Sequence, residues 1–600
     1  MKIMICIKWM FSLLVFVVNS YSQYTHPGCA GPVQGDFKEV KLVQRSGNEG
    51  VRDATLWEPV QFDFEPVYNT AGDSITFVNL YFIERREQNG LRNGVNGLTE
   101  RVGYLKKYNA ETKQVEVIGK LKVHSPIDGD SDHGIKGLAL HPDFKNNKQI
   151  FIQYSAFDPT NNGARSGNTN IEMRVSRFIL NSSGKLALNS EKVLLVSHSG
   201  KHNWIHHGGA MDFDSEGNLY ITMGNSSPDH NKNSSGSHVS NDSLWSAQIG
   251  AGNTASFNGS ILKIHPDNSA LGYSIPADNF GEYWSKQFDI QGKSALAAEY
   301  LDVNKVLPEI FSKGHRSNYS ITTHPTKNWV TWGDVNPGSN DDEWNIVNHP
   351  VFAGYPYFYG NQKRTAGHNL DPLVPRNTSS IHSGVVDLPP AMAGTISGTG
   401  RVNMTGPIYV YDTRFKSAVR FPPHFNDQWF TFDWSTGQIF THKLDLDNST
   451  NPVVSSNEIS NSLFRNITRT NPLEADFGPD GAFYMINYAG PGNGGSTNRT
   501  EIIKIEYTGS CQPVLNVTEH ALLKGLQIIF NTNSITVQEK EMHTLNFYGL
   551  NGTKLYHVQN KGQIEYYFEK IKNKLKLSTG LYFVEVVVGQ KKVRFKVPMY

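Results

Sequence analysis

Six times along residues 60–510, a polar turn is followed by a short apolar run rich in aromatic side chains. The runs are Phe77–Phe82, Ile150–Ile152, Leu219–Ile221, Trp329–Val330, Trp429–Phe432 and Phe483–Ile486. Neighbouring runs lie about 50 to 110 residues apart, which leaves room for a four-stranded sheet and its loops in each interval. Because a radial repeat of such sheets makes a β-propeller, the pattern predicts an all-β fold with a six-bladed β-propeller at 60–510. An irregular array of β-sandwiches is the alternative.

A smaller unit is predicted at 522–600, after a linker at 511–521. It contains alternating apolar runs such as Leu581–Val586, and Asn551-Gly552 is a hairpin turn signal. From residue 521 onward there are 12 Lys and Arg, 5 Glu and no Asp, which gives a net charge of +7 against −6 for the rest of the chain. These features predict a small, basic C-terminal β-sandwich.

The first 22 residues have the pattern of a secretory signal. Lys2 and Lys8 precede an apolar run at Trp9–Val18, and Ser20-Tyr21-Ser22 is a small-x-small cleavage site. The run is shorter than the ~20 residues that span a bilayer, which disfavours a retained membrane anchor. We therefore predict a signal peptide at 1–22, an N-terminal extension at 23–59, and an exported protein without a transmembrane segment.

Charge and cysteine content narrow the class of protein. The chain carries 56 Lys and Arg against 55 Asp and Glu, and 11% of its residues are aromatic. This balance disfavours disorder and a nucleic-acid partner bound by bulk positive charge. Of the 3 cysteines, Cys6 lies in the signal, so Cys29 and Cys511 are left either for one disulfide or for two unpaired thiols.

His206 stands in the stretch with the most chemical information. His206 and His207 precede Gly208-Gly209 at the start of a predicted strand, and Gly224-Asn225 follows the next apolar run. Glycine lets the backbone approach a ligand closely, and histidine is the side chain best suited to accept a proton near neutral pH. His206 is therefore a candidate general base, and a strand-end histidine bonded to backbone is the alternative. A zinc pair with His202 is disfavoured, because the stretch leads into a strand rather than a helix.

The stretch His206–Asn225 resembles the soluble quinoprotein glucose/sorbosone dehydrogenases, whose pattern reads His-x-Gly-Gly, then Phe-x-x-Asp-Gly-x-Leu-Tyr, then Gly-Asp. Further segments are similar to the same family in the same order, and the resemblance covers roughly 60–505. These segments are Asp132–Phe144, Arg174–Phe178, Asn258–Ile264, Pro308–Ser317, Gly333–Pro337, Asp342–Asn345 and Phe477–Tyr484.

The resemblance implies a six-bladed propeller that holds pyrroloquinoline quinone (PQQ) and Ca2+ at one mouth. It implies oxidation of an aldose-type sugar at C1, with His206 as the general base while hydride moves to the quinone. The residues that correspond to the family's cofactor contacts are Arg316 and Ser317, further candidates are Arg465 and Arg469, and the calcium-binding carbonyls correspond to Asn336 and Pro337. The sequence contains no haem-attachment motif, so a separate electron acceptor is expected.

Two substitutions depart from the family pattern. Asn225 stands where the family has Asp, and Ser317 stands where it has Asn. The Asp carboxylate would orient the base and stabilise its protonated form, whereas an amide forms hydrogen bonds without offsetting the charge. The sequence therefore leaves two functions open: a PQQ-dependent sugar dehydrogenase, or a catalytically degenerate propeller that binds glycan or protein at the cell surface.

Several charged residues also have plainer interpretations. An acidic run at 128–132 resembles the start of a calcium loop, but His133 stands where that loop needs Gly and Ala139 where it needs Glu. We therefore expect a surface turn that includes Asp132. Residues 341–343 are either part of the family motif or a solvated acidic turn, and the two candidate arginines at 465 and 469 are otherwise exposed charges.

The C-terminal unit has a resemblance of its own. Leu545–Gly552, Leu577–Val584 and Lys591–Phe595 are similar to the type IX secretion sorting domain. This implies a protein that is secreted or held at the cell surface, with the type IX machinery as a partner. A carbohydrate-binding or adhesive β-domain is the alternative.

Overall fold

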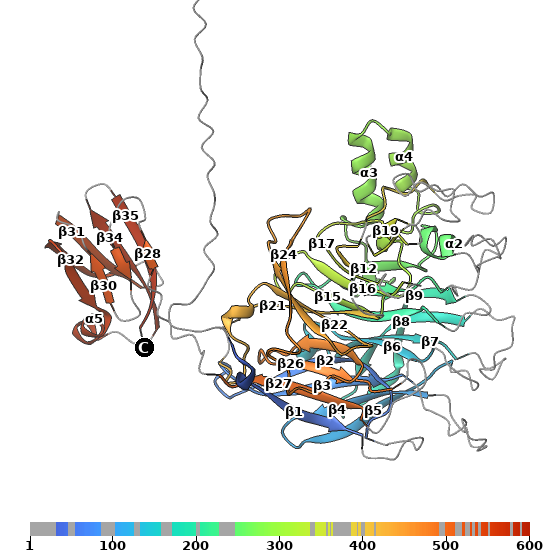
Figure 1. Ribbon diagram of the computed structural model, residues 1–600, viewed down its shortest axis with the longest axis horizontal. Helices are drawn as coiled ribbons and strands as arrows, with labels where there is room; N and C mark the ends of the chain where they lie inside the picture. The colour runs from blue at the N-terminus through green and yellow to red at the C-terminus, as the bar shows by residue number, and fades with distance from the viewer. Residues whose placement is uncertain are drawn as a thin grey trace, which may run out of the picture. The chain divides into compact units, whose positions relative to one another are not determined.

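The computed structural model shows two compact units, Val33–Ser510 and a second that contains Cys511–Tyr600 (Figure 1). The predicted signal peptide, Cys29 and Cys511 lie outside the described residues. The structure describes residues 32–45, 55–85, 102–124, 132–157, 171–199, 205–226, 247–336, 342–355, 358–360, 362–363, 386–392, 394–397, 402–412, 416–490, 499–509, 519–521, 528–530, 534–537, 542–549, 553–576, 580–588 and 591–599.

Antiparallel strands carry most of the first unit, which confirms an all-β fold with few helices. Its described residues form six sheets of four or five strands and one short hairpin, β18 (Phe358–Tyr359) with β19 (Gln362–Lys363). The first three sheets contain β2 (Pro59–Tyr68), β3 (Ile75–Glu84), β4 (Val102–Asn109) and β5 (Gln114–Lys122); β6 (Ile135–Leu140), β7 (Gln149–Ser155), β8 (Ile171–Leu180) and β9 (Leu186–Ser199); and β10 (Gly208–Phe213), β11 (Leu219–Met223), β12 (Ser260–Pro266), β13 (Tyr273–Ser274) and β14 (Ile310–Lys313).

The remaining sheets follow in chain order, apart from the first strand of the unit, which joins the last sheet. They contain β15 (Ser320–Thr323), β16 (Val330–Asp334), β17 (Glu343–Val347) and β20 (Ile396–Ser397); β21 (Asn403–Tyr409), β22 (Gln428–Asp433), β23 (Ile439–Leu444) and β24 (Val453–Glu458); and β25 (Pro472–Phe477), β26 (Phe483–Asn487), β27 (Glu501–Tyr507) and β1 (Phe37–Gln44).

The six apolar runs found in the sequence fall on the second strand of six different sheets. They coincide with, or directly precede, β3, β7, β11, β16, β22 and β26. These strands are apolar on consecutive residues because both faces are covered; β7 and β26, for example, are buried at nearly every position. A strand packed on both faces reads as a continuous apolar run rather than an alternating one.

The first strands of the six sheets contact one another in a closed order among the described residues. The order is β2, β6, β10, β15, β21 and β25, and β25 returns to β2. The backbones of β6 and β10 approach so closely that a Cβ on Gly137 would lie 2.1 Å from the Gly209 carbonyl oxygen. Glycine is required at this contact because any side chain would separate the two strands.

Strand β1 joins the two ends of the first unit. It pairs antiparallel with β27, with Phe37 opposite Tyr507. The Phe37 ring lies 5.2 Å from Phe421 and 5.1 Å from Phe464, so it is anchored in an aromatic cluster. Residues 37–44, which we expected in an N-terminal extension, are thus the outer strand of the last sheet.

Helices are short in the described residues. The bounds of those in the first unit are η1 (Gln34–Asp36), α1 (Phe144–Asn147), α2 (Ala247–Gly252), α3 (Phe280–Ile290), α4 (Ser294–Tyr300) and η5 (Pro423–Phe425). Helices α3 and α4 pack together beside the third sheet through Phe288 and Tyr300, whose ring centroids are 5.1 Å apart. Among the residues placed in the structure, no helix is long and apolar enough to cross a membrane.

In the second unit, two sheets share one core. The sheets contain β28 (Glu519–Ala521), β29 (Ile528–Phe530), β30 (Ser534–Val537) and β33 (Ile564–Tyr567); and β32 (Lys554–Lys561), β31 (Met542–Tyr548), β34 (Gly580–Val588) and β35 (Lys591–Met599). Ile535 of the first sheet and Val584 of the second belong to the same apolar cluster, together with Phe568 of α5 (Phe568–Leu575). Strand β28 lies within the segment that we expected to be a linker.

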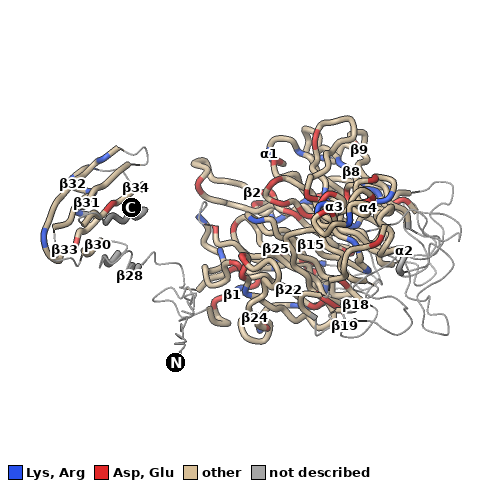
Figure 2. Tube along the Cα trace, turned by 90° about the horizontal axis from the view of Figure 1, so that it is seen from above, with Lys and Arg blue, Asp and Glu red and all other residues tan. Residues whose placement is uncertain are grey.

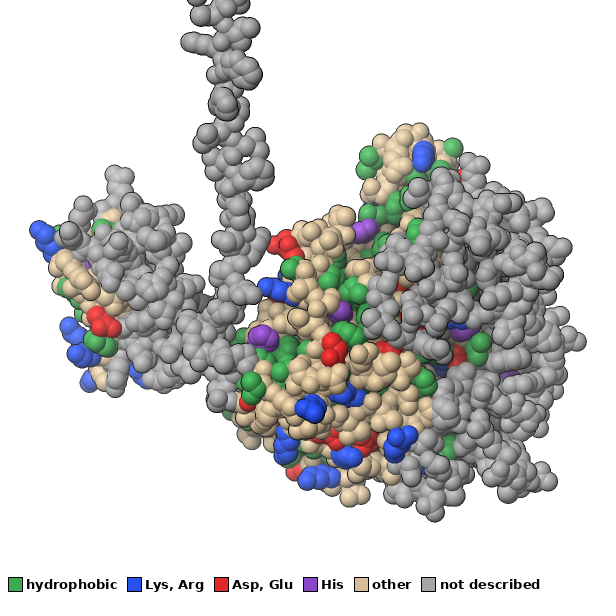
Figure 3. Space-filling view, in the orientation of Figure 1, with side chains coloured by type: hydrophobic (Ala, Val, Ile, Leu, Met, Phe, Trp, Pro, Cys, Tyr) green, Lys and Arg blue, Asp and Glu red, His purple; other side chains and the backbone are tan. Residues whose placement is uncertain are grey.

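Charged residues of both signs are interspersed over the described part of the first unit (Figures 2 and 3). This distribution agrees with its nearly balanced composition.

Replacing Gly137 with alanine should destabilise the first unit, because the new methyl group would collide with the β10 backbone. We expect a loss of about 2–3 kcal/mol in the free energy of unfolding, measured by urea denaturation. Gly35→Ala is the matched control, since a Cβ there meets nothing within 4 Å. Equal stability of the two variants would contradict the close approach of β6 and β10.

Candidate functional site

A cavity of about 230 Å³ lies where the first strands of the six sheets meet. All six of these strands, or the loops joined to them, contribute to its wall. The polar side chains in the wall are Arg85, Asp132, Lys136, His206, Ser317, Tyr319 and Tyr488. The remaining wall is largely apolar and consists of Val60, Ile205, Gly208, Gly209, Val335, Val402, Met404, Trp434 and Leu473.

His206 reaches this cavity from a tight turn before β10. Its backbone has φ of 64°, in the left-handed region that disfavours side chains. Its N–H donates to Asp132 Oδ2 at 2.7 Å, and its carbonyl accepts from the Ser226 N–H at 3.0 Å. A Cβ on Gly224 would lie 2.1 Å from that carbonyl oxygen, which explains the glycine there. The turn leaves His206 8% exposed, at the cavity wall.

Asp132 does not lie in a surface turn, so that expectation was wrong. It is 2% exposed and lines the cavity. Burial by itself would raise the pKa of Asp132, but the charges of Lys136 and Arg85 and the nearby histidines hold that pKa below its usual range. The acidic run at 128–132 was the misleading signal in the sequence. Residues 128–131 of that run lie outside the described part of the chain. The motif Asp132–Phe144 was the better guide.

Lys136 and Arg85 are cavity cations that the sequence analysis missed. The Lys136 ammonium lies 4.4 Å from the ring centroid of Tyr319. Arg85 Nε donates to Glu58 Oε2 at 3.2 Å, and its Nη2 donates to the Tyr488 hydroxyl at 3.3 Å. Lys136 is part of the motif that begins at Asp132, whereas Arg85 carried only the weak signal of a charged residue directly after an apolar strand.

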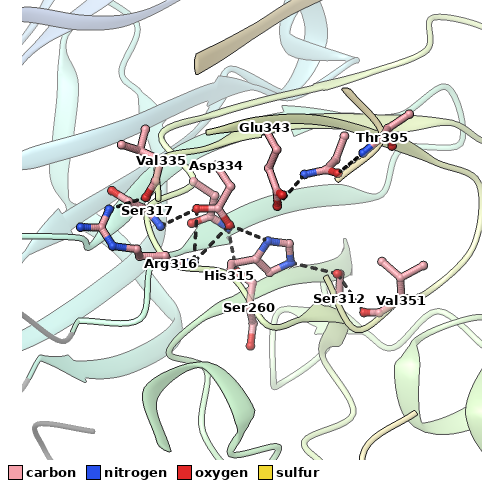
Figure 4. A network of polar contacts seen from close by, with 12 residues as sticks. Ser260, Ser312, His315, Arg316, Ser317, Asp334, Val335, Glu343, Val351 and Thr395 are labelled. Carbon is pink, nitrogen blue, oxygen red and sulfur yellow. Dashed lines mark hydrogen bonds and ion pairs between the residues drawn. The ribbon is translucent and has the colours of Figure 1, made fainter. Parts of the chain in front are cut away.

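Arg316 and Ser317 are held by a buried carboxylate at the end of β16 (Figure 4). Asp334 accepts the Arg316 N–H at 3.1 Å and the Ser317 N–H at 2.7 Å. The Arg316 guanidinium donates to the Val335 carbonyl. Because Ser317 and Val335 both line the cavity, Asp334 fixes the segment that closes this side of the wall.

Asp334 also belongs to a serine–histidine–aspartate contact chain. His315 Nδ1 lies 3.5 Å from Asp334 Oδ2, and its Nε2 lies 2.9 Å from Ser312 Oγ. All three side chains are buried, and none of them lines the cavity. Ser312 Oγ donates to the Val351 carbonyl, so the chain braces the loop and offers no nucleophile to a substrate.

Residues 342 and 343 are buried, which excludes a solvated acidic turn at these two positions. Asp342 accepts the Asn336 N–H at 2.8 Å and the Asn403 N–H at 3.3 Å. Burial raises the pKa of Asp342 to about 8, and raises that of Glu343 well above its usual range. Pro337 lies outside the described residues. Within the part of the chain that is placed, no group of three or more His, Cys, Asp or Glu side chains is arranged to hold a metal ion.

Asn225 and Arg316 are brought together, but the two other candidate arginines are not. The Asn225 N–H donates to the Arg316 carbonyl at 2.9 Å, which ties the end of β11 to the Arg316 segment. Arg469 donates to the carbonyls of Ser460 and Phe464, at 2.6 Å for the latter. Arg465 is exposed, and neither Arg465 nor Arg469 lines the cavity.

A group of half-buried aspartates stands three residues farther along the same first strands. Val60, Gly209 and Leu473 line the cavity, and Asp63, Asp212 and Asp476 follow them on β2, β10 and β25. Burial raises the pKa of Asp63 to about 6 and that of Asp212 to about 7. The Asp212 carboxylate accepts from the N–H of Thr323 at 2.6 Å and from its hydroxyl at 3.0 Å.

Residues 91–281 match the protein-family model described as Glucose / Sorbosone dehydrogenase. This range contains Asp132, Lys136, His206 and Asn225 but not Arg316. The chain is 23% identical over 299 residues to quinoprotein glucose dehydrogenase B of Acinetobacter calcoaceticus, with 48% of this chain and 55% of that protein covered. It therefore spans about half the length of this curated relative. These matches support the resemblance to the glucose/sorbosone dehydrogenases.

Two solved structures are also similar in part. The soluble aldose sugar dehydrogenase of Escherichia coli in the apo-form is 14% identical, with 78% of this chain and 99% of that chain covered and a TM-score of 0.46. The PQQ-bound aldose sugar dehydrogenase of Streptomyces coelicolor is 14% identical, with 79% and 99% covered and a TM-score of 0.43.

The raised pKa values of Asp63 and Asp212 predict a pH-dependent stability. Both groups titrate near pH 4 in an unfolded chain, so they favour the folded state most below that pH. Their contribution is lost as pH rises through about 6 to 7. Asp212→Asn should therefore lose less stability than wild type between pH 5 and 8, as measured by the urea midpoint. An exposed control, Asp143→Asn, should follow wild type. Parallel pH profiles for wild type and Asp212→Asn would contradict this explanation.

Proposed function

We propose that this protein is a secreted quinoprotein dehydrogenase that oxidises an aldose-type sugar at C1. The observation that carries the proposal is the position of His206. It lies in a cavity wall beside two cations and an aspartate, within the segment that matches the Glucose / Sorbosone dehydrogenase family model. A histidine at a partly apolar cavity is suited to accept a proton from a bound hydroxyl group.

We propose that the six sheets of the first unit are the blades of a six-bladed β-propeller. The closed order of contacts among their first strands supports this arrangement, as does the presence of one predicted apolar run in each of these six sheets. The second unit is proposed to be a β-sandwich, because side chains from its two sheets meet in one core.

The cavity wall suits a planar polyanion such as PQQ. Arg85 and Lys136 are the cations of the wall, each next to a carboxylate (Glu58 and Asp132), and Trp434 supplies an aromatic side chain. Arg316 would contribute from the segment that Asp334 holds in place. When bound, PQQ supplies the two-electron oxidant that no protein side chain provides. Backbone carbonyls at Asn336 and Pro337 are proposed to hold Ca2+, an ion that prefers oxygen ligands.

In this proposal, His206 accepts the proton of the sugar C1 hydroxyl group. The apolar wall around it excludes water and strengthens the charge interactions of the site. Asn225 itself has no charge with which to stabilise the imidazolium that forms. Electrons would then leave to a separate acceptor.

The proposed site of action is outside the cell. The signal at 1–22 would direct export, and the unit at 522–600 would be the sorting domain recognised by the type IX machinery. The basic composition of that unit and its two-sheet core are compatible with this role.

A second function is a propeller that binds glycan or protein at the cell surface without catalysis. Specific observations favour it: Asn225 and Ser317 replace the family's Asp and Asn, and neither Arg465 nor Arg469 reaches the cavity. In that case the apolar and aromatic wall would serve as a binding surface.

The proposal is tested by dye reduction with the secreted chain, residues 23–600, supplied with PQQ and Ca2+. The substrates are a panel of aldoses and oligosaccharides. We expect turnover that His206→Ala lowers by about 10²- to 10⁴-fold, the size of a general-base contribution. The control His198→Ala removes an exposed histidine on β9 and should retain activity. Absence of turnover together with absence of PQQ binding by titration would favour the binding function.

A further inference from the structure

We propose that Asp132 is the positioning residue for His206, and that its carboxylate, in the segment before β6, supplies the charge that Asn225 does not carry. Asp132 precedes β6, whereas Asn225 follows β11. The inference rests on the proposed function, because it assigns a partner to the general base. The direct contact and its electrostatic consequence can be measured without turnover.

The first observation is the hydrogen bond to the backbone of His206. Asp132 Oδ2 accepts the His206 N–H at 2.7 Å, and both residues are buried. A hydrogen bond to an ionised carboxylate is stronger than one between neutral groups. It therefore holds His206 in its left-handed backbone conformation, which a non-glycine residue adopts only when its surroundings enforce it. The position of the imidazole at the cavity depends on that conformation.

The second observation is the set of charged groups around the pair. Lys136 on β6 and Arg85 after β3 face Asp132, and both stabilise its ionised form. Glu58 is already bound by Arg85, so it does not take the place of Asp132. Asp132 thus remains a carboxylate next to His206, at a position where its charge interacts with the imidazole.

The charge of Asp132 also acts on His207, but burial outweighs it there. His207 is fully buried, and burial lowers its pKa to about 3, so it is neutral at physiological pH. His133 packs between His207 and His124, with ring centroids 4.4 and 4.8 Å away. The His207 Nδ1 contacts Ser226 Oγ at 3.0 Å, and this contact holds the His207 ring in a position that does not line the cavity. His206, in contrast, lines the cavity, where a substrate hydroxyl group can reach it.

The consequence is a charge partner supplied from a different place in the fold. An aspartate at position 225 would stabilise a protonated His206 from the end of β11. In this chain Asp132 provides that stabilisation, and its hydrogen bond also fixes the backbone of His206. A carboxylate at either position raises the pKa of the imidazole, since an opposite charge favours the charged form.

The test is a titration of His206 by NMR in the full chain with labelled histidine, without PQQ or sugar. The His206 signal is assigned by its loss in His206→Gln. Asp132→Asn should lower the pKa of the His206 imidazole by about one unit or more. Glu111→Gln, which removes an exposed acid in the turn between β4 and β5, should leave the His206 pKa unchanged. Adding Asn225→Asp to Asp132→Asn should raise the pKa of the His206 imidazole again, at least part of the way to the wild-type value.

Activity provides a second arm, with dye reduction as the readout. The acid limb of the kcat/KM profile should move to lower pH in Asp132→Asn, and kcat should fall more than KM changes. Asp132→Glu keeps the charge, so it should retain a His206 pKa near wild type even if Asp132→Asn fails to fold. A His206 pKa within about 0.3 unit of wild type in folded Asp132→Asn, or a lowered pKa in Asp132→Glu, would overturn the inference. If wild type shows no turnover, the proposed function fails while the titration still decides the role of Asp132.

Discussion

The pairing of β1 with β27 is the contact on which the first unit depends. It places residues 37–44 and 501–507 in one sheet, so the sheet that ends the unit also contains its beginning. A closed order of sheets needs such a joint, because without it the first and last sheets would be held only by packing. The aromatic cluster around Phe37 adds apolar burial to the hydrogen bonds of the strand. With the ring closed, the first strands of all six described sheets converge, and their ends define the cavity.

Where the first strands converge, charged side chains are removed from water, which costs free energy. Two arrangements reduce this cost. Near the cavity, buried charges are paired: Asp132 faces Lys136 and Arg85, and Arg85 is bound by Glu58. Farther along the same strands, carboxyl groups such as Asp63 and Asp212 lie together, and their pKa values rise because burial disfavours the ionised form. The Asp132 carboxyl group at the cavity is thus kept ionised by cations, whereas Asp63 and Asp212 have raised pKa values. This separation gives the cavity its chemical character, and it supports the proposal of a polar reaction there.

Much of the architecture followed from local pattern. The six apolar runs each mark a second strand, because a strand covered on both faces must be apolar at consecutive positions. The family motifs also singled out His206, which lines the cavity, and Arg316, which does not. Strand β1 was missed, since its alternating polar residues are those of an outer strand and resemble any solvated segment. Asp132 was misjudged because its neighbours in sequence are acidic, whereas its neighbours in space are cations.

The sequence by itself determined the all-β class, the number of repeated strand signals, and the histidine that precedes a Gly-Gly pair, because each of these depends on residues close together in the chain. The tertiary structure decided which charges meet. Arg85 after β3, the pair Asp132 and Lys136 at β6, and Tyr488 after β26 share one cavity. Arg465 and Arg469 lie near a motif in sequence and remain outside it. The physical reason is that a charge takes its role from the groups around it in space, and those groups are set by how the sheets close rather than by their order along the chain.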